Sequence, residues 1–295
     1  MNKFAMSLVT LIMSVLPHHL LSRFARRLAY SKQAWLKHWM IHAVIIRFKV
    51  DLSDAAEPNP DAYRCFNDFF TRPLRPDARR ADPDPRTILM PADGFISQLG
   101  PIDRGQIFQA KGRMFTCQAL LGSREDALAF HSGCFATIYL SPRDYHRVHM
   151  PWAGRLVKTV HVPGRLWSVG PATVKTVTGV FARNERLICH FETDFGPMAI
   201  IMVGALLVSG IETVWNGVEI PSYTKQTVER DWRSLALNLP RFAQMAHFNY
   251  GSTVIVLLPE RRASLIPHLT AGQAVRVGQG LAQQTDAKTT PSPEP

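Results

Sequence analysis

Two hydrophobic patterns divide the chain near residue 50. Before it, large apolar residues recur at helical spacing between basic ones and predict amphipathic helices over 3–16, 18–29 and 32–48. Ser31 is the expected N-cap of the third helix. From residue 90 onward, short apolar runs rich in β-branched residues are separated by Gly and Pro, which is typical of strands. The predicted strands are Ile96–Leu99, Cys134–Leu140, Leu156–Val162, Leu187–Phe191, Ala199–Val208 and Thr253–Leu258.

These patterns predict an α+β fold, with N-terminal amphipathic helices followed by a β-rich domain. The helices occupy residues 1–50, the β-rich domain residues 51–282, and a polar, Pro-ending tail that we expect to be disordered residues 283–295. The connecting segments are predicted to be an acidic linker (Asp51–Asp61), one aromatic-rich helix (Tyr63–Thr71) and an extended loop (Arg72–Arg86).

Composition narrows the class of protein. The 295 residues are 46% apolar and 19% charged, which is typical of a folded chain with a core of its own. The four cysteines (Cys65, Cys117, Cys134 and Cys189) contain no CxxC pair, so a zinc ribbon or a disulfide scaffold is not expected. They fit reduced, buried residues of a cytosol-facing protein.

Charge is concentrated at the N-terminus. Residues 1–50 hold eight Lys and Arg and no Asp or Glu, although the net charge of the whole chain is only +11. Such asymmetry indicates an anionic partner, either nucleic acid or a membrane surface. The many large apolar residues in the same segment favour the membrane and argue against nucleic acid. A helical layer packed on the protein's own core is the alternative.

The apolar run over residues 4–16 is too short to cross a bilayer, which takes about 20 residues. No A-x-A-like cleavage site follows it, as a signal peptide would require. We therefore expect interfacial helices that attach the protein peripherally to the membrane.

The first candidate for chemistry is the pair Gly251-Ser252, directly before an apolar strand. A serine there is commonly a turn hydroxyl. It could also attack the preceding carbonyl, and the resulting ester could eliminate to dehydroalanine and hydrolyse to a pyruvoyl group. The chain has a second such pair, Gly122-Ser123. The rigid strand that follows Ser252 favours Gly251-Ser252.

His146 and His149 lie three residues apart in a polar segment between prolines, Ser141–Pro151. Two such histidines suggest a metal pair or acid–base catalysis, or else a structural role. Because no HExxH motif supplies further ligands, no metal site is predicted. Asp93 lies in an Asp-Gly turn signal and could instead orient a histidine, so that Asp93, His149 and Ser252 would form a triad.

Several longer motifs occur in one order along almost the whole chain. They are FNDFFTRPLRP (Phe66–Pro76), MPADGFISQLG (Met90–Gly100), YLSPRDYHRVHMP (Tyr139–Pro151), FARNERLICHF (Phe181–Phe191), IETVWNG (Ile211–Gly217) and YGSTVI (Tyr250–Ile255). In these motifs the chain resembles the bacterial, membrane-associated phosphatidylserine decarboxylases. The family usually carries Leu-Gly-Ser-Thr at its processing site, whereas this chain has Tyr250 in place of the Leu. We expect processing that is slower or unchanged.

The resemblance implies a proenzyme that cleaves itself between Gly251 and Ser252 through the triad Asp93, His149 and Ser252. The β chain (1–251) and the α chain (252–295) would stay together as a heterodimer. Ser252 would become the covalent pyruvoyl cofactor, an electron sink that forms a Schiff base with the amine of phosphatidylserine. His146 matches a family histidine linked to decarboxylation. The product would be phosphatidylethanolamine, made at the anionic phospholipid surface on the cytoplasmic side of the cell membrane.

Two other classes stay open from the residues alone. The first is a membrane-surface serine hydrolase with Ser252 as nucleophile, although Tyr250 and Val254 stand where a G-x-S-x-G elbow would need glycines. The second is a membrane-binding protein without enzymatic activity.

Overall fold

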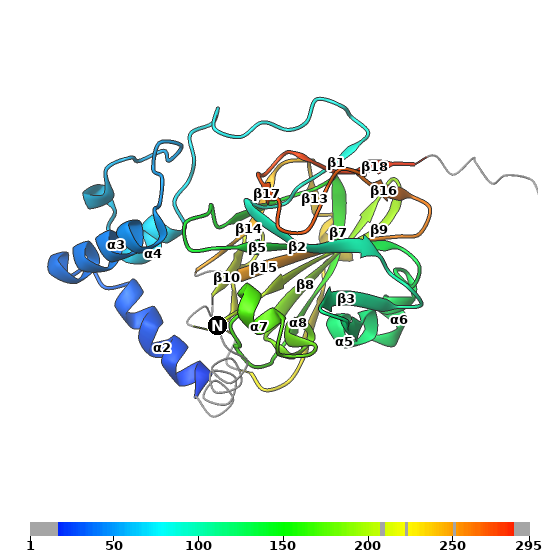
Figure 1. The fold of residues 1–295 in the computed structure, drawn as a ribbon, viewed down its shortest axis with the longest axis horizontal. Helices are drawn as coiled ribbons and strands as arrows, with labels where there is room; N and C mark the ends of the chain where they lie inside the picture. The colour runs from blue at the N-terminus through cyan, green and yellow to red at the C-terminus, as the bar shows by residue number, and fades with distance from the viewer. Residues whose placement is uncertain (1–16, 207–209, 222–223, 250–251, 286–295) are drawn as a thin grey trace, which may run out of the picture.

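The fold is seen in a computed structural model that describes residues 17–206, 210–221, 224–249 and 252–285. The predicted helix over 3–16 and the residues Tyr250 and Gly251 lie outside these ranges. The longest described helices lie at the N-terminal side, and the rest of the molecule is mainly strands with a few short helices, which confirms the predicted α+β class (Figure 1).

The largest sheet of the described residues has nine strands and is antiparallel throughout. Its order is β12-β7-β8-β9-β15-β5-β2-β17, and β13 also pairs with β7. These strands are β2 (Gly94–Pro101), β5 (Cys134–Leu140), β7 (Gly154–Val162), β8 (Arg186–Thr193), β9 (Gly196–Val203), β12 (Val228–Asp231), β13 (Asn238–Leu239), β15 (Ser252–Leu258) and β17 (Ala274–Val275).

Both faces of this sheet are covered, which explains why β15 is apolar at nearly every position. Successive side chains of a strand point to opposite faces. Val254 and Val256 join one hydrophobic cluster, whereas Ile255 and Leu257 join another.

The first of these clusters lies under two small sheets, β1-β18-β16 and β11-β10-β14-β6. Their strands are β1 (Thr87–Leu89), β6 (Arg147–His149), β10 (Ile211–Thr213), β11 (Gly217–Ile220), β14 (Gln244–Phe248), β16 (Ala263–Leu265) and β18 (Gly280–Gln284). The short helix η2 (Arg233–Leu235) follows β12.

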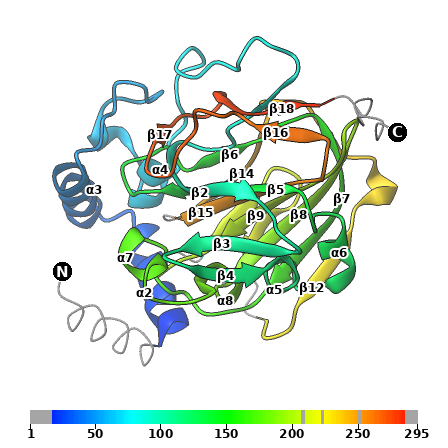
Figure 2. The same cartoon turned by 45° about the vertical axis from the view of Figure 1, so that its right-hand side comes forward.

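The second cluster lies under a hairpin and four short helices (Figure 2). These elements are β3 (Gln106–Ala110), β4 (Arg113–Thr116), α5 (Cys117–Leu121), α6 (Arg124–Leu128), α7 (Pro171–Val174) and α8 (Val180–Arg183).

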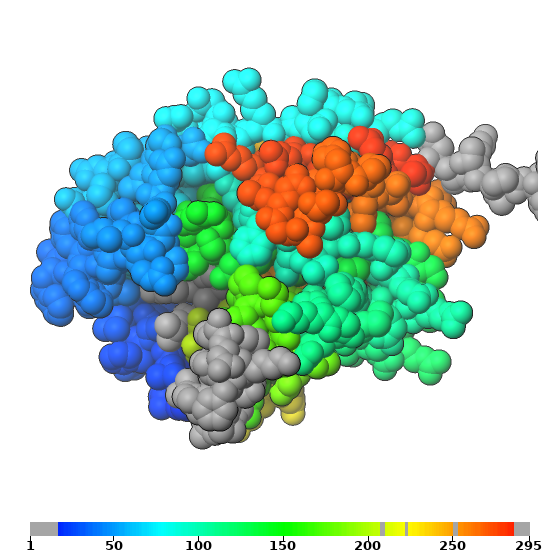
Figure 3. All heavy atoms as spheres, viewed as in Figure 1, coloured from blue at the N-terminus to red at the C-terminus, as the bar shows by residue number. Residues whose placement is uncertain are grey.

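The N-terminal helices form a separate layer, visible as the blue lobe at one side of the molecule (Figure 3). The layer consists of α2 (His18–Ala29), α3 (Ala34–Phe48), η1 (Pro60–Ala62) and α4 (Phe66–Phe70). Its own small core joins Ile41 of α3 to Tyr63 and three phenylalanines of α4. This core crosses the predicted domain boundary at residue 50.

The described helices differ in detail from the predicted ones. α2 has the predicted bounds, but α3 begins at Ala34 with the extended Gln33 as N-cap. Ser31 is therefore not the cap; its hydroxyl accepts a hydrogen bond from the Gln33 amide instead. The helix predicted over Tyr63–Thr71 is reduced to α4, because Cys65 is extended (φ −154°, ψ 172°) and delays its start.

The strand predictions are mostly confirmed, and β5 has the predicted bounds. The strand expected over Ala199–Val208 instead ends at Val203, where the chain leaves the sheet at Gly204. The tail predicted from Gln283 was placed too early, since Gln283 and Gln284 belong to β18 and pair with β1 and β16. The acidic linker is also anchored, because Ala55 is buried and bridges to Leu74.

Candidate active site

Strand register brings the three predicted motifs to one end of β5. Ser252 pairs with Leu140 on one side of β5, and Phe95 of β2 pairs with Tyr139 on the other. The loop that follows β5 carries His146, and β6 directly after it ends at His149, whose amide donates to the Pro91 carbonyl (2.8 Å). Segments about 50 and 100 residues apart in sequence thus meet at one place.

The Asp-Gly turn signal has a packing reason at this point. Gly94 has φ +149°, and a Cβ atom there would lie 2.2 Å from the Tyr139 carbonyl oxygen. Only glycine allows β2 to approach β5 so closely directly after Asp93.

The second Gly-Ser pair has a structural role. Gly122 ends α5 in the left-handed region (φ 73°), and the Ser123 hydroxyl caps α6 by accepting a bond from the Asp126 amide (3.2 Å). Both positions are explained by helix capping, so Gly251-Ser252 is left as the candidate for chemistry.

Asp93 is buried and held by a guanidinium that sequence reasoning missed. Arg79 Nε donates to both carboxylate oxygens (3.0 and 3.1 Å), and its Nη2 donates to Oδ2. The Val277 amide donates to Oδ1 (2.8 Å), while Arg79 also pairs with Asp54. Burial lowers the pKa of Arg79, but its bonds to the two carboxylates outweigh burial and raise the pKa above the usual value. The guanidinium is therefore a permanent positive charge beside Asp93.

His149 is positioned by two groups on opposite edges of its ring. Its Nδ1 lies 2.8 Å from the Phe242 carbonyl, which can only accept, so Nδ1 carries the proton. Nε2 is then an acceptor and receives the Tyr145 hydroxyl at 3.1 Å. Burial lowers the pKa of His149; the bond to Phe242 and the charge of Asp93 offset this only in part. The ring is therefore neutral near pH 7, as a general base must be.

The relation between Asp93 and His149 differs from a hydrogen-bonded dyad. No hydrogen bond joins them within the part of the chain that the structure describes. The Phe242 carbonyl fixes the tautomer, and Asp93 acts on His149 through its charge. A backbone carbonyl gives no signal in the sequence, so the role of Phe242 could not be predicted.

His146 lies deeper than His149 and has no exposed surface. Its Nδ1 donates to the Asp144 carbonyl (2.8 Å), its ring lies 4.0 Å from the Phe70 ring of α4, and none of the described residues bonds its Nε2. Burial, with the nearby charge of Arg72, lowers the pKa of His146 to about 3. It is a neutral imidazole whose Nε2 is available as an acceptor.

A cavity of about 370 Å³ opens beside Asp93 and Tyr145. Its charged lining residues are Lys49, Arg72, Arg79, Arg143, Arg276, Asp51, Asp54, Asp93 and Asp144. Such a wall of mixed charge suits a zwitterionic ligand that carries phosphate, carboxylate and ammonium groups.

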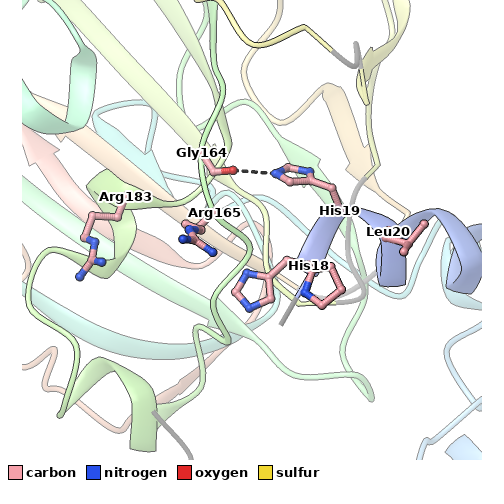
Figure 4. Close-up of a pocket in the computed structure, with 7 residues that line it drawn as sticks. His18, His19, Leu20, Gly164, Arg165 and Arg183 are labelled. Carbon is pink, nitrogen blue, oxygen red and sulfur yellow. Dashed lines mark hydrogen bonds between the residues drawn. The ribbon is translucent and has the colours of Figure 1, made fainter. Parts of the chain in front are cut away.

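A larger cavity, of about 560 Å³, lies elsewhere, between the start of α2 and the loop after β7 (Figure 4). There the His19 ring contacts the Gly164 carbonyl at 2.9 Å. None of the predicted site residues lines this cavity. Its contacts hold α2 against the body of the protein.

Comparison with known proteins shows the family of the chain. A family model described as phosphatidylserine decarboxylase matches residues 66–283, and a second, described as PSD, matches residues 8–49. The chain belongs to the phosphatidylserine decarboxylase family.

Relatives cover nearly the full length of the chain. It is 62% identical to a phosphatidylserine decarboxylase proenzyme of Xanthomonas campestris pv. campestris (strain 8004), over 95% of this chain and 99% of that protein. The proteins of the same name from Xanthomonas euvesicatoria pv. vesicatoria and Stenotrophomonas maltophilia are 61% and 59% identical. These matches cover 95% and 94% of this chain, and 100% and 99% of the relatives.

Proposed function

We propose that the chain is a proenzyme that cleaves itself between Gly251 and Ser252 and then decarboxylates phosphatidylserine to phosphatidylethanolamine and CO2. The main support is the strand register that gathers Asp93, His149 and the backbone of Ser252 at one end of β5. The names of the relatives agree with this reaction and do not favour a serine hydrolase.

Cleavage needs a base for the Ser252 hydroxyl. In the proposed step, His149 Nε2 exchanges its bond to the Tyr145 hydroxyl for one to the Ser252 hydroxyl and accepts that proton while the Ser252 oxygen attacks the Gly251 carbonyl carbon. The amide C–N bond then breaks, the proton passes from His149 to the leaving nitrogen, and an ester forms. Loss of the Cα proton of residue 252 and rupture of its Cβ–O bond expel Gly251 as a carboxylate and leave residue 252 as dehydroalanine. Water then converts dehydroalanine to the pyruvoyl ketone and releases ammonia.

Asp93 is the proposed electrostatic partner of His149. When His149 takes up the proton it becomes an imidazolium, which the nearby carboxylate stabilises. Arg79 holds the Asp93 carboxylate in place with a countercharge, because an unpaired buried carboxylate would be strongly disfavoured. Asp93 therefore stabilises the charge that develops on His149.

The pyruvoyl carbonyl would supply the electron sink that decarboxylation requires. Residue 252 suits a fixed reactive group, because its backbone pairs with Leu140 at the start of a buried central strand. The arginines of the 370 Å³ cavity would bind the phosphate and carboxylate of the headgroup. His146 is the proposed proton-transfer residue, with Nε2 as the atom that exchanges the proton.

The two products of cleavage should remain one heterodimer. The α chain would carry β15, which lies between β9 and β5 in the middle of the large sheet. Val254 and Leu257 are fully buried there. Cleavage at residue 252 would thus leave the core intact and free only the start of the strand.

The N-terminal helices are the proposed site of peripheral attachment to the anionic, cytoplasmic face of the cell membrane. No described helix is long and apolar enough to span a membrane. Trp35 and Trp39 are 72% and 67% exposed on α3, and Phe24 is exposed on α2 near Arg23 and Arg27. Aromatic side chains beside arginines suit the headgroup region of a bilayer. The inner face of α3 packs on α4, so this layer both docks on the protein and exposes apolar surface.

We propose that the domains divide this work. Residues 1–50 attach to lipid and residues 51–282 carry out cleavage and decarboxylation, with the residues after Gln284 outside both functions.

Site variants test the proposal. Ser252→Ala should remain one chain and form no phosphatidylethanolamine, whereas Ser123→Ala should cleave normally. Asp93→Ala and His149→Ala should also block cleavage on a denaturing gel, while the exposed His131→Ala should not. Normal fragment ratios in either site variant would refute the triad.

Vesicles test the membrane part. Removal of residues 1–50 should weaken binding to phosphatidylglycerol-containing vesicles, and high salt should weaken binding of the full chain in part, because salt screens only the charges. Equal binding of the truncated and full chains would contradict attachment through these helices.

A further inference from the structure

Two histidines and a carboxylate converge where α3 meets η1, away from the cleavage site. His38 and His42 are one turn apart on α3, and their rings are stacked with centroids 6.1 Å apart. His38 Nδ1 lies 2.8 Å from Asp61 Oδ1, and His42 Nε2 lies 3.2 Å from the same oxygen. One ligand atom from each residue thus falls within 4.8 Å of the others.

The backbone that carries the Asp61 carboxylate is held against α3 by hydrogen bonds that do not involve the two histidines. Lys37 Nζ donates to the Asp61 carbonyl (3.0 Å) and to the Tyr63 carbonyl (2.7 Å). The Asn59 side chain accepts from the Asp61 amide at 3.0 Å. The backbone that carries Asp61 is therefore fixed against α3, which preorganises the three groups.

We propose that His38, His42 and Asp61 bind a divalent transition-metal ion of the Zn²⁺ class. Two imidazole nitrogens and one carboxylate oxygen suit Zn²⁺, Ni²⁺ or Cu²⁺ better than Mg²⁺ or Ca²⁺. Three protein ligands leave a fourth position for water, as in open zinc sites. This proposal is independent of the proposed decarboxylase activity.

The two separations that involve Asp61 are close to those of a metal-bound set, and the two histidine nitrogens lie within 4.8 Å of each other. Ligand atoms around tetrahedral Zn²⁺ lie about 3.4 Å apart, given bonds of about 2.0–2.1 Å. The distance of 3.2 Å between His42 and Asp61 fits, whereas the 2.8 Å between His38 and Asp61 must open slightly. The side chains of His38 and Asp61 are 42% and 51% exposed, so they have room to make this adjustment.

A bound ion would join α3 to the segment that follows it. His42 and Asp61 are 19 residues apart in sequence, and the metal would replace a pair of hydrogen bonds by coordinate bonds. Because metal binding stabilises the folded state that contains the site, the ion should raise the melting temperature. The expectation of no metal site rested on the missing HExxH motif around His146 and His149. Asp61 lies too far from His38 and His42 in the sequence to form a recognisable motif with them.

Zinc titration of the full-length, chelator-treated protein tests the site. Calorimetry should show one equivalent bound, and Co²⁺ should give the visible absorption bands of a protein-bound ion. His38→Ala, His42→Ala and Asp61→Asn should each weaken binding at least tenfold. His268→Ala removes an exposed histidine elsewhere and should leave binding unchanged.

Two results would overturn the proposal. The first is equal Zn²⁺ affinity in the wild type and in the double variant His38→Ala/His42→Ala. The second is a wild-type chain that shows neither the Co²⁺ bands nor a Zn²⁺-dependent rise in melting temperature, which would leave the cluster a surface ion pair only. The Asp61→Asn variant keeps the shape of the side chain, so it separates loss of ligation from loss of folding.

Discussion

The N-terminal layer and the central sheet are both rich in large apolar residues. The sheet buries these residues, whereas the N-terminal layer leaves several of them exposed. In β15, Val254 to Val256 are completely buried between two clusters. In α3, Ile41 is buried while Ile46 on another side of the same helix is 78% exposed. The apolar residues of β15 therefore stabilise the fold, whereas the exposed ones of α3 are available to lipid.

Charges show the same contrast. Arg79 and Asp93 form a pair with little solvent exposure, whereas Arg27 on α2 is exposed. A buried charge must keep its partner, and an exposed charge can attract one from outside the molecule. The comparison thus separates the buried, paired charges of the candidate site from the exposed charges of the N-terminal layer, to which we assign membrane attachment.

The largest expected effect comes from the buried ion pair. Arg79→Ala leaves the Asp93 carboxylate buried without a countercharge and should lower the free energy of unfolding by about 3–5 kcal/mol. The exposed Arg27→Ala should change it by less than about 0.5 kcal/mol. Urea unfolding of both variants measures the difference. Similar losses of stability in the two variants would contradict the difference between buried and exposed charges.

The buried and exposed apolar residues give the next contrast. Leu257→Ala should lower the free energy of unfolding by about 2–5 kcal/mol, because it opens a cavity in the core. Trp39→Ala should leave stability nearly unchanged and weaken vesicle binding. A Trp39→Ala variant that loses stability and binds vesicles normally would assign α3 to the protein's own core alone.

The buried histidines should make the sheet region sensitive to acid. The pKa of His146 is lowered from 6.5 to about 3, so between these pH values His146 is protonated in the unfolded chain but neutral in the folded state. The stabilisation from neutral His146 is therefore complete above about pH 6.5 and is lost progressively as the pH falls toward 3. Urea unfolding at several pH values should show this slope, and His146→Asn should reduce it. An unchanged slope in that variant would contradict the assignment.

The rate of self-cleavage should also fall in acidic solution. Because burial lowers the pKa of His149, the base form persists below the usual titration range of histidine. The rate of self-cleavage should be level near pH 7 and fall only in more acidic solution. An ordinary histidine has a pKa of about 6.5, and a lowered pKa keeps the base form present at still lower pH. A cleavage rate that already falls steeply as the pH drops from 8 to 7 would therefore exclude His149 as the base.

The smallest effect concerns Tyr145. Tyr145→Phe removes one hydrogen bond to His149, worth about 1 kcal/mol, and should change the cleavage rate by less than about tenfold. Densitometry of the uncleaved chain over time measures the rate. Complete loss of cleavage would indicate that the hydroxyl takes part in proton transfer.

The strands and the candidate site residues could be predicted from the sequence, because apolar runs and short motifs are both local patterns. Alternating burial on two covered faces makes β5 and β15 apolar runs that are visible in the sequence. The partners of the site residues could not be reached in this way. Arg79 is one of several arginines in a loop rich in Pro, Asp and Arg, and nothing in the sequence distinguishes it from Arg75 or Arg80. Phe242 acts through its backbone carbonyl, which every residue possesses.

The most direct measurement is the intact mass of the purified protein. The account predicts two polypeptides, one of residues 1–251 and one of residues 252–295, the smaller lacking a free amino terminus and shifted in mass by the conversion of serine to a pyruvoyl group. A single unbroken chain that still forms phosphatidylethanolamine would contradict the account.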